Sequence, residues 1–211
     1  MNTRKLTKQP PVRLATLPRL LLLALFFTAG VLLGQVLASW VPDATGDELR
    51  RYLEDYLRLG GGAAPTPRTV VSTLVIYFRY PLLAFLLGFA SIGVVLLPCA
   101  TAAYGFFLSF SVCCFTASFG ADGVLLALAV FGLRCAVTLP CYFLLAAPSW
   151  GTAAGLAAVS FGSGRRTAPV VYGRACWIRL GACCLALLAG VCVDVLLSPV
   201  LLRLMLERIL G

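Results

Sequence analysis

The sequence predicts an all-α, polytopic bundle of about five transmembrane spans with one short extracytoplasmic amphipathic helix. The first observation is composition: the 211 residues are 61% hydrophobic and 12% charged, whereas soluble domains are about half apolar and about a quarter charged. The second is pattern, because the apolar residues gather in long runs with few charges. A bilayer solvates such runs, and water does not.

The N-terminal part predicts a tail followed by a first span. Residues 1–19 are basic and contain no acid, which favours a cytoplasmic tail. Residues 20–41 carry no charge, and ~33 Å of helix is enough to cross a hydrocarbon core of about 30 Å. A cleaved signal peptide is the alternative, since Val36-Leu37-Ala38 fits a small-residue cleavage pattern. The length of the apolar run favours an uncleaved span.

Residues 42–72 form the one sizeable polar segment and are expected on the extracytoplasmic side. Thr45 and Glu48 have the spacing of a capping box, which predicts a helix over 46–59. Its apolar residues recur at helical spacing on one face: Leu49, Tyr52, Leu53, Tyr56 and Leu57. That face either packs on the protein's own spans and the lipid head groups, or docks an extracytoplasmic partner.

Residues 73–211 predict the rest of the membrane bundle. Four further spans are expected at 81–97, 100–118, 124–161 and 180–202. Arg79 is expected at the membrane interface before the second span, and Pro98 is expected to mark a tight turn. Gly105 and Ser109 lie four residues apart, a small-residue spacing that lets transmembrane helices pack closely.

The run 124–161 is too long for one straight crossing, since its 38 residues would give ~57 Å of helix. One layout is a short or re-entrant helix over 124–136 followed by a span over 137–161. The other is a single kinked and tilted helix. Pro140 and Pro148 favour the broken form.

Two charges stand inside apolar runs, Arg134 and Asp194. Charges inside a membrane are costly, so they usually pair or line a watery cavity. Three interpretations follow: an ion pair that joins the fourth and fifth spans, two side chains that reach water near the interfaces, or part of an ion pathway.

The residue inventory argues against an enzyme. The chain has no histidine, which removes histidine-based catalytic triads and the common zinc motifs. The nine cysteines lie in or beside apolar segments, where cysteine packs as a small apolar residue. No catalytic, cofactor or metal site is therefore expected. The basic residues lie in short runs between apolar segments, which is typical of cytoplasmic loops rather than of nucleic-acid binding.

The order of segments resembles the stage II sporulation protein M family of endospore-forming bacteria. Three stretches carry the resemblance: Leu86 to Gly93, Tyr104 to Phe110, and Gly120 to Ala129. They are similar to hydrophobic elements of that family and occur in the same order. The chain departs from the family at Tyr104, where a lysine is usual, and at 133–135, where Pro-Gln-Asn is frequent.

This resemblance implies a function that no residue demonstrates by itself. It implies a non-enzymatic membrane scaffold for engulfment during endospore formation, located in the mother-cell or septal membrane. The partners that it implies are an amidase and a lytic transglycosylase that act on septal peptidoglycan. A transporter or permease-like subunit is the alternative, for which broken helices and polar residues at mid-membrane are expected.

Overall fold

The computed structural model describes residues 12–40, 67–160 and 173–210. These residues are almost all helical, and the element order is α1 (Val12–Ala38), α3 (Pro67–Leu87), α4 (Gly93–Ala127), the π-helical segment η1 (Leu128–Gly132), α5 (Leu133–Ser160) and α6 (Arg174–Leu210). Within the described residues, five stretches are long and apolar enough to cross a membrane: Thr16–Ala38, Val70–Leu87, Gly93–Ala117, Leu133–Ser160 and Arg174–Leu197. The chain is a multi-pass membrane protein, and the prediction of an all-α bundle with about five spans is confirmed.

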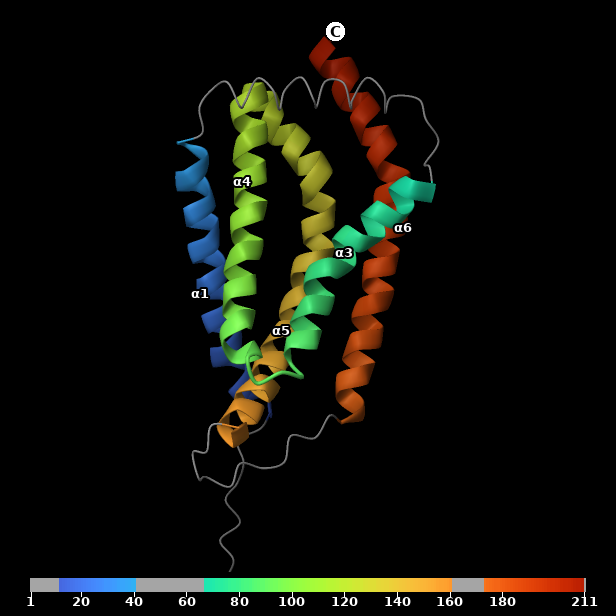
Figure 1. The fold of residues 1–211 in the computed structure, drawn as a ribbon. Helices are drawn as coiled ribbons and strands as arrows, with labels where there is room; N and C mark the ends of the chain where they lie inside the picture. Colours follow the sequence, from blue (N-terminus) through green and yellow to red (C-terminus); the bar gives the residue numbers. More distant parts are fainter. Residues whose placement is uncertain (1–11, 41–66, 161–172, 211) are drawn as a thin grey trace, which may run out of the picture.

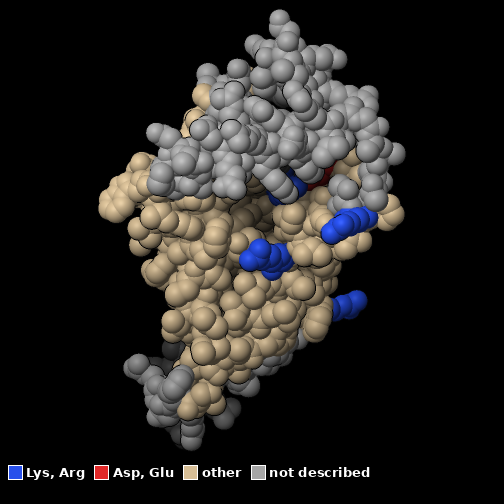
Figure 2. All heavy atoms as spheres, turned by 45° about the horizontal axis from the view of Figure 1, so that its top comes forward, with Lys and Arg blue, Asp and Glu red and all other residues tan. Residues whose placement is uncertain are grey.

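The spans run up and down between two ends of the bundle (Figure 1). We call the end that holds the α3–α4 turn, residues 88–92, the lower end, and the end that holds Gly120 the upper end. Helix α5 contacts each of the other four spans, and α1 packs mainly against α4. On the face that Figure 2 shows, the described surface is formed mostly by uncharged residues, with isolated basic side chains. Such a surface suits lipid rather than water.

The α3–α4 turn corrects the predicted second span, 81–97. Helix α3 ends at Leu87, and α4 begins at Gly93, so Pro98 lies inside a helix instead of marking a turn. The turn is made by short backbone bonds such as Gly88 N–H to the Phe85 carbonyl, at 3.1 Å. A Cβ at Gly88 would lie 2.8 Å from the Ser149 Cβ, so glycine at this position allows the turn to sit directly on α5.

Pro98 is tolerated because a side chain replaces the hydrogen bond that it removes. A proline inside a helix leaves the carbonyl four residues earlier without its N–H partner. Here that carbonyl belongs to Val94, and the indole Nε1–H of Trp150 donates to it at 3.0 Å. The bond also ties α4 to α5.

The chain reverses at Gly120, between the predicted spans 100–118 and 124–161 (Figure 1). Gly120 has φ 60° and ψ −133°, a backbone conformation that costs side-chain-bearing residues strain. From there one helical path runs through η1 to Ser160. The favoured break near Pro140 is therefore wrong, because Pro140 and Pro148 both lie inside α5. The single irregular helix was the other alternative, and its irregularity is the π-helical turn at 128–132.

The remaining boundaries also shift. Helix α1 begins at Val12, inside the predicted tail 1–19, and α3 begins at Pro67, inside the predicted polar segment 42–72. Proline suits the first turn of a helix, where its missing N–H has no partner. The last helix begins at Arg174 rather than at 180 and extends to Leu210. The predicted amphipathic helix over 46–59 lies outside the described residues.

Candidate functional site

The two intramembrane charges meet inside the bundle, between α5 and α6. Arg134 is the second residue of α5, and its Nη2 donates to Asp194 Oδ2 of α6 at 3.1 Å. The Asp194 side chain is 8% exposed and that of Arg134 is 22% exposed. The structure thus has the interhelical ion pair that was one of the three interpretations of these charges.

Tyr77 of α3 completes this cluster. Its ring centroid lies 5.6 Å from the Arg134 guanidinium carbon, a cation–π distance. Tyr77 is fully buried, and its hydroxyl has no hydrogen-bond partner in the described structure; the same holds for Nε of Arg134. Polar groups in this state usually have a water or a ligand beside them. One cluster therefore joins α3, α5 and α6.

Two hydroxyl bridges connect α4 to α5 below the ion pair. The Thr138 hydroxyl donates to the Arg134 carbonyl at 2.8 Å, so Tyr104 is the donor in its 2.8 Å bond to Thr138. By the same reasoning, Thr101 donates to the Leu97 carbonyl at 2.7 Å and accepts from Tyr142 at 2.7 Å. A hydroxyl has one proton to donate, which fixes these directions.

A cavity of about 140 Å³ lies between α3, α4 and α5 beside the ion pair. Its polar lining comes from Tyr77, Tyr80, Tyr104, Ser111, Arg134 and Thr138. At ~30 Å³ for each water, it has room for a few water molecules. The cavity can therefore hydrate the unpartnered groups of Tyr77 and Arg134.

The predicted packing residues Gly105 and Ser109 lie at the contact between α1 and α4. A Cβ at Gly105 would collide with the Phe27 carbonyl. The surface of α1 that faces these residues was not predicted from the sequence. A Cβ at Gly34 would lie 2.6 Å from the Phe106 carbonyl and 3.2 Å from the Ser109 Cβ. A Cβ at Gly30 would collide with the Ala102 carbonyl. The spacing Gly30-x-x-x-Gly34 was the signal that could have found it.

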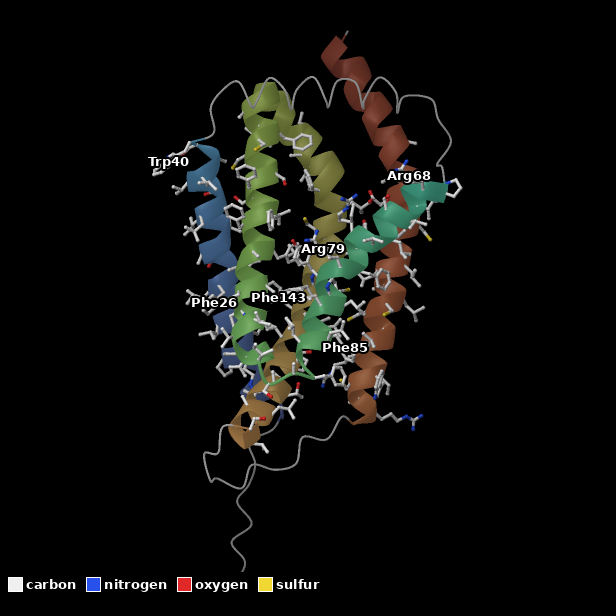
Figure 3. All side chains as sticks on the ribbon, in the orientation of Figure 1. Phe26, Trp40, Arg68, Arg79, Phe85 and Phe143 are labelled. Carbon is white, nitrogen blue, oxygen red and sulfur yellow. The ribbon has the colours of Figure 1, made fainter. Side chains whose placement is uncertain are left out.

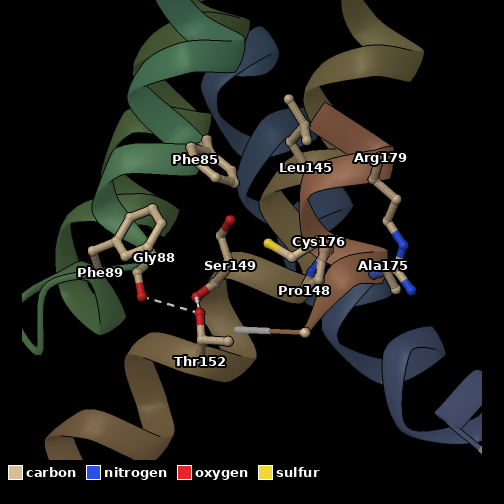
Figure 4. A pocket seen from close by; sticks show the side chains of 11 residues that line it. Phe85, Gly88, Phe89, Leu145, Pro148, Ser149, Thr152, Ala175, Cys176 and Arg179 are labelled. Carbon is tan, nitrogen blue, oxygen red and sulfur yellow. Dashed lines mark hydrogen bonds between the residues drawn. The ribbon is translucent and has the colours of Figure 1, made fainter. Parts of the chain in front are cut away.

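A second pocket, of about 330 Å³, lies at the lower end (Figure 4). Phe85 and Phe89 line one side, the α5 residues Ser149 and Thr152 another, and Arg179 lies on α6. Thr152 Oγ1 lies 2.8 Å from the Ser149 carbonyl and 3.0 Å from the Gly88 carbonyl, so its one proton is shared between α5 and the α3–α4 turn. The lining is mostly apolar, and Arg179 is the one charged residue among its described residues.

The cysteines do not form a metal-binding group in the described ranges. Cys141 and Cys183 are buried between α5 and α6, and no three or more His, Cys, Asp or Glu side chains come together there. The predicted docking face lies outside the described residues: Leu49, Tyr52, Leu53, Tyr56 and Leu57.

Comparison of the chain with protein-family models, with curated proteins and with solved structures gives no match. The candidate site therefore has to be interpreted from its own chemistry.

Proposed function

We propose that this protein is a non-enzymatic membrane scaffold. The proposal is supported by how the interior polar side chains are used. The ion pair and the two hydroxyl bridges connect one helix to another, as does the indole of Trp150. Bonds of this kind between transmembrane helices fix a bundle in one arrangement. A rigid bundle suits a protein that positions partners.

The resemblance to the stage II sporulation protein M family supplies the more specific proposal. The scaffold holds a peptidoglycan amidase and a lytic transglycosylase at the septum during engulfment. Its N-terminus is cytoplasmic, and the segment 42–72 faces the partners on the other side. The acid-free basic tail supports this orientation.

Co-purification from sporulating cells of the parent organism tests the proposal. We expect the tagged chain to recover both enzymes, and recovery to fall when Leu49, Tyr52 and Tyr56 are changed to serine. The matched control changes Arg51 and Arg58 to serine on the opposite side of the predicted helix, and should leave recovery intact. Recovery of neither enzyme by the unmodified chain would contradict the scaffold.

The second candidate is a transporter subunit, and one observation favours it. The 140 Å³ cavity places unpartnered groups of Tyr77 and Arg134 inside the membrane-spanning part, where polar residues often mark an ion or substrate path. Proton flux into proteoliposomes, followed with an internal pH dye, tests this reading. Flux that depends on both Arg134 and Asp194 would favour the transporter, and flux equal to that of empty vesicles would contradict a proton path.

A further inference from the structure

Arg79 lies in the middle of a membrane-spanning helix rather than at its edge. It is the tenth of the eighteen residues in the stretch Val70–Leu87. Figure 3 shows it about half-way down the bundle, whereas Arg68 lies at the upper end of the same helix. The α3–α4 turn at 88–92 lies before the predicted end of this span at 97. The span therefore begins closer to the N-terminus than predicted, and it includes Arg79.

Contacts with α1 and α4 also place Arg79 half-way along the bundle. Phe27 is the central residue of Thr16–Ala38, and its ring centroid lies 6.0 Å from that of Tyr104, the twelfth of 25 residues in Gly93–Ala117. Tyr104 in turn stacks on Tyr80 at 4.3 Å. At about 1.5 Å per residue, this level is ~16 Å from the helix ends. Arg79 is the neighbour of Tyr80 and therefore lies near the membrane centre.

The charge of Arg79 is not neutralised within the described structure. Its side chain is exposed and makes no ion pair with a described residue, and its guanidinium carbon lies 5.2 Å from the Tyr80 ring centroid. One exposed cation–π contact offsets only part of the cost of a cation at this depth. An arginine side chain reaches about 6 Å from the helix, whereas the polar head groups lie about 15 Å away.

Arg79 is the centre of an exposed stripe on α3. Val75, Leu82, Leu83 and Leu86 are exposed and lie four residues before it and three, four and seven residues after it, which places them on the same helix face. We name these five residues the α3 stripe. It is an apolar helix surface with one cation at its centre, and a second helix can lie along it.

We infer that the α3 stripe docks a membrane-spanning helix of a different protein, which carries an Asp or Glu at mid-membrane depth. The inference rests on the proposed scaffold function and names the surface and the chemistry of one partner. An opposite charge on the docked helix would neutralise Arg79 and satisfy its donors.

A second copy of this chain does not provide that carboxylate. Asp194 is the only acidic residue in the five membrane-spanning stretches. It is already bonded to Arg134 of its own chain, so its charge is not free to neutralise Arg79. The partner is therefore a different chain.

Photo-crosslinking in native membranes tests the inference. Benzoylphenylalanine is introduced at Val75 or Leu86, beside Arg79, and at Leu185 on α6 as an exposed control position. We expect an adduct with another membrane protein from the two α3 positions and none from Leu185. Arg79→Leu should lower its yield by about tenfold or more, Arg79→Lys should keep most of it, and Arg68→Leu should leave it unchanged.

Three results would overturn the inference: adducts that contain only phospholipid, adducts only with a second copy, or a partner adduct whose yield Arg79→Leu does not change. The purified chain provides a further check, because an Arg79→Leu variant that unfolds more easily than wild type would show a role inside the fold. The two proposals fail separately. If the unmodified chain recovers both enzymes and Arg79→Leu recovers them equally well, only the inference fails; if the adduct depends on Arg79 but its partner is not a peptidoglycan enzyme, only the partner assignment fails.

Discussion

Removing either charge of the buried pair should destabilise the bundle more than removing both. The perturbations are Arg134→Leu, Asp194→Leu and the double replacement, which substitute apolar groups for a pair bonded at 3.1 Å. Each single variant leaves one charge without its partner between helices. The double variant leaves none.

The burial of the pair sets the expected magnitudes. Breaking a buried pair costs roughly 3–5 kcal/mol, whereas replacing both partners is often close to neutral. We expect ~3 kcal/mol for Arg134→Leu, because Asp194 is 8% exposed. We expect ~2 kcal/mol for Asp194→Leu, because Arg134 is 22% exposed and retains the Tyr77 ring. The double variant should lose no more than about 1 kcal/mol.

Unfolding by SDS in mixed micelles, followed by circular dichroism, measures these three free energies. Tyr77→Phe is the control, because it keeps the ring and removes a hydroxyl that has no partner in the described structure. Its free energy of unfolding should differ from that of the wild type by less than ~0.5 kcal/mol. If the double variant loses as much stability as the two single variants together, the charges do not act as a pair.

The Trp150 and Gly120 predictions use the same unfolding assay. Trp150→Phe leaves the Val94 carbonyl without its donor and should cost ~1–2 kcal/mol of unfolding free energy. Pro98→Ala restores a backbone N–H for that carbonyl, so the double variant should recover part of the loss. If it recovers none, the Trp150 indole does not replace the bond that Pro98 removes. Gly120→Ala should cost ~1–3 kcal/mol from backbone strain alone, since a Cβ there meets nothing within 4 Å. Gly181→Ala, equally open but inside α6, should instead stabilise by up to ~1 kcal/mol, and equal losses at both glycines would contradict the role of the positive φ.

The number of spans could be predicted from the sequence, but their limits could not. Long apolar runs determine how many helices cross a bilayer. The limits depend on how each proline is accommodated, and Pro98 lies inside α4 because Trp150, 52 positions later, supplies the missing donor. Such a bond between distant residues has no local sequence signal.

The candidate site could be predicted from the sequence only in part. A charge inside an apolar run needs a partner or access to water, so the pairing of Arg134 with Asp194 was one of three interpretations that the sequence left open. Tyr77 was not predictable as their neighbour, because its place depends on where α3 begins and ends. The mid-membrane position of Arg79 was hidden by the same error in the limits of that helix.

The glycine contact between α1 and α4 has a consequence for biogenesis. More than fifty residues separate the end of α1 from the start of α4, and a ribosome needs several seconds to add them at ~5–20 residues per second. During that time α1 stands in the bilayer with the backbone at Gly30 and Gly34 uncovered by its eventual neighbour. The close contact between α1 and α4 can therefore form only after α1 has existed for some time without its main packing partner.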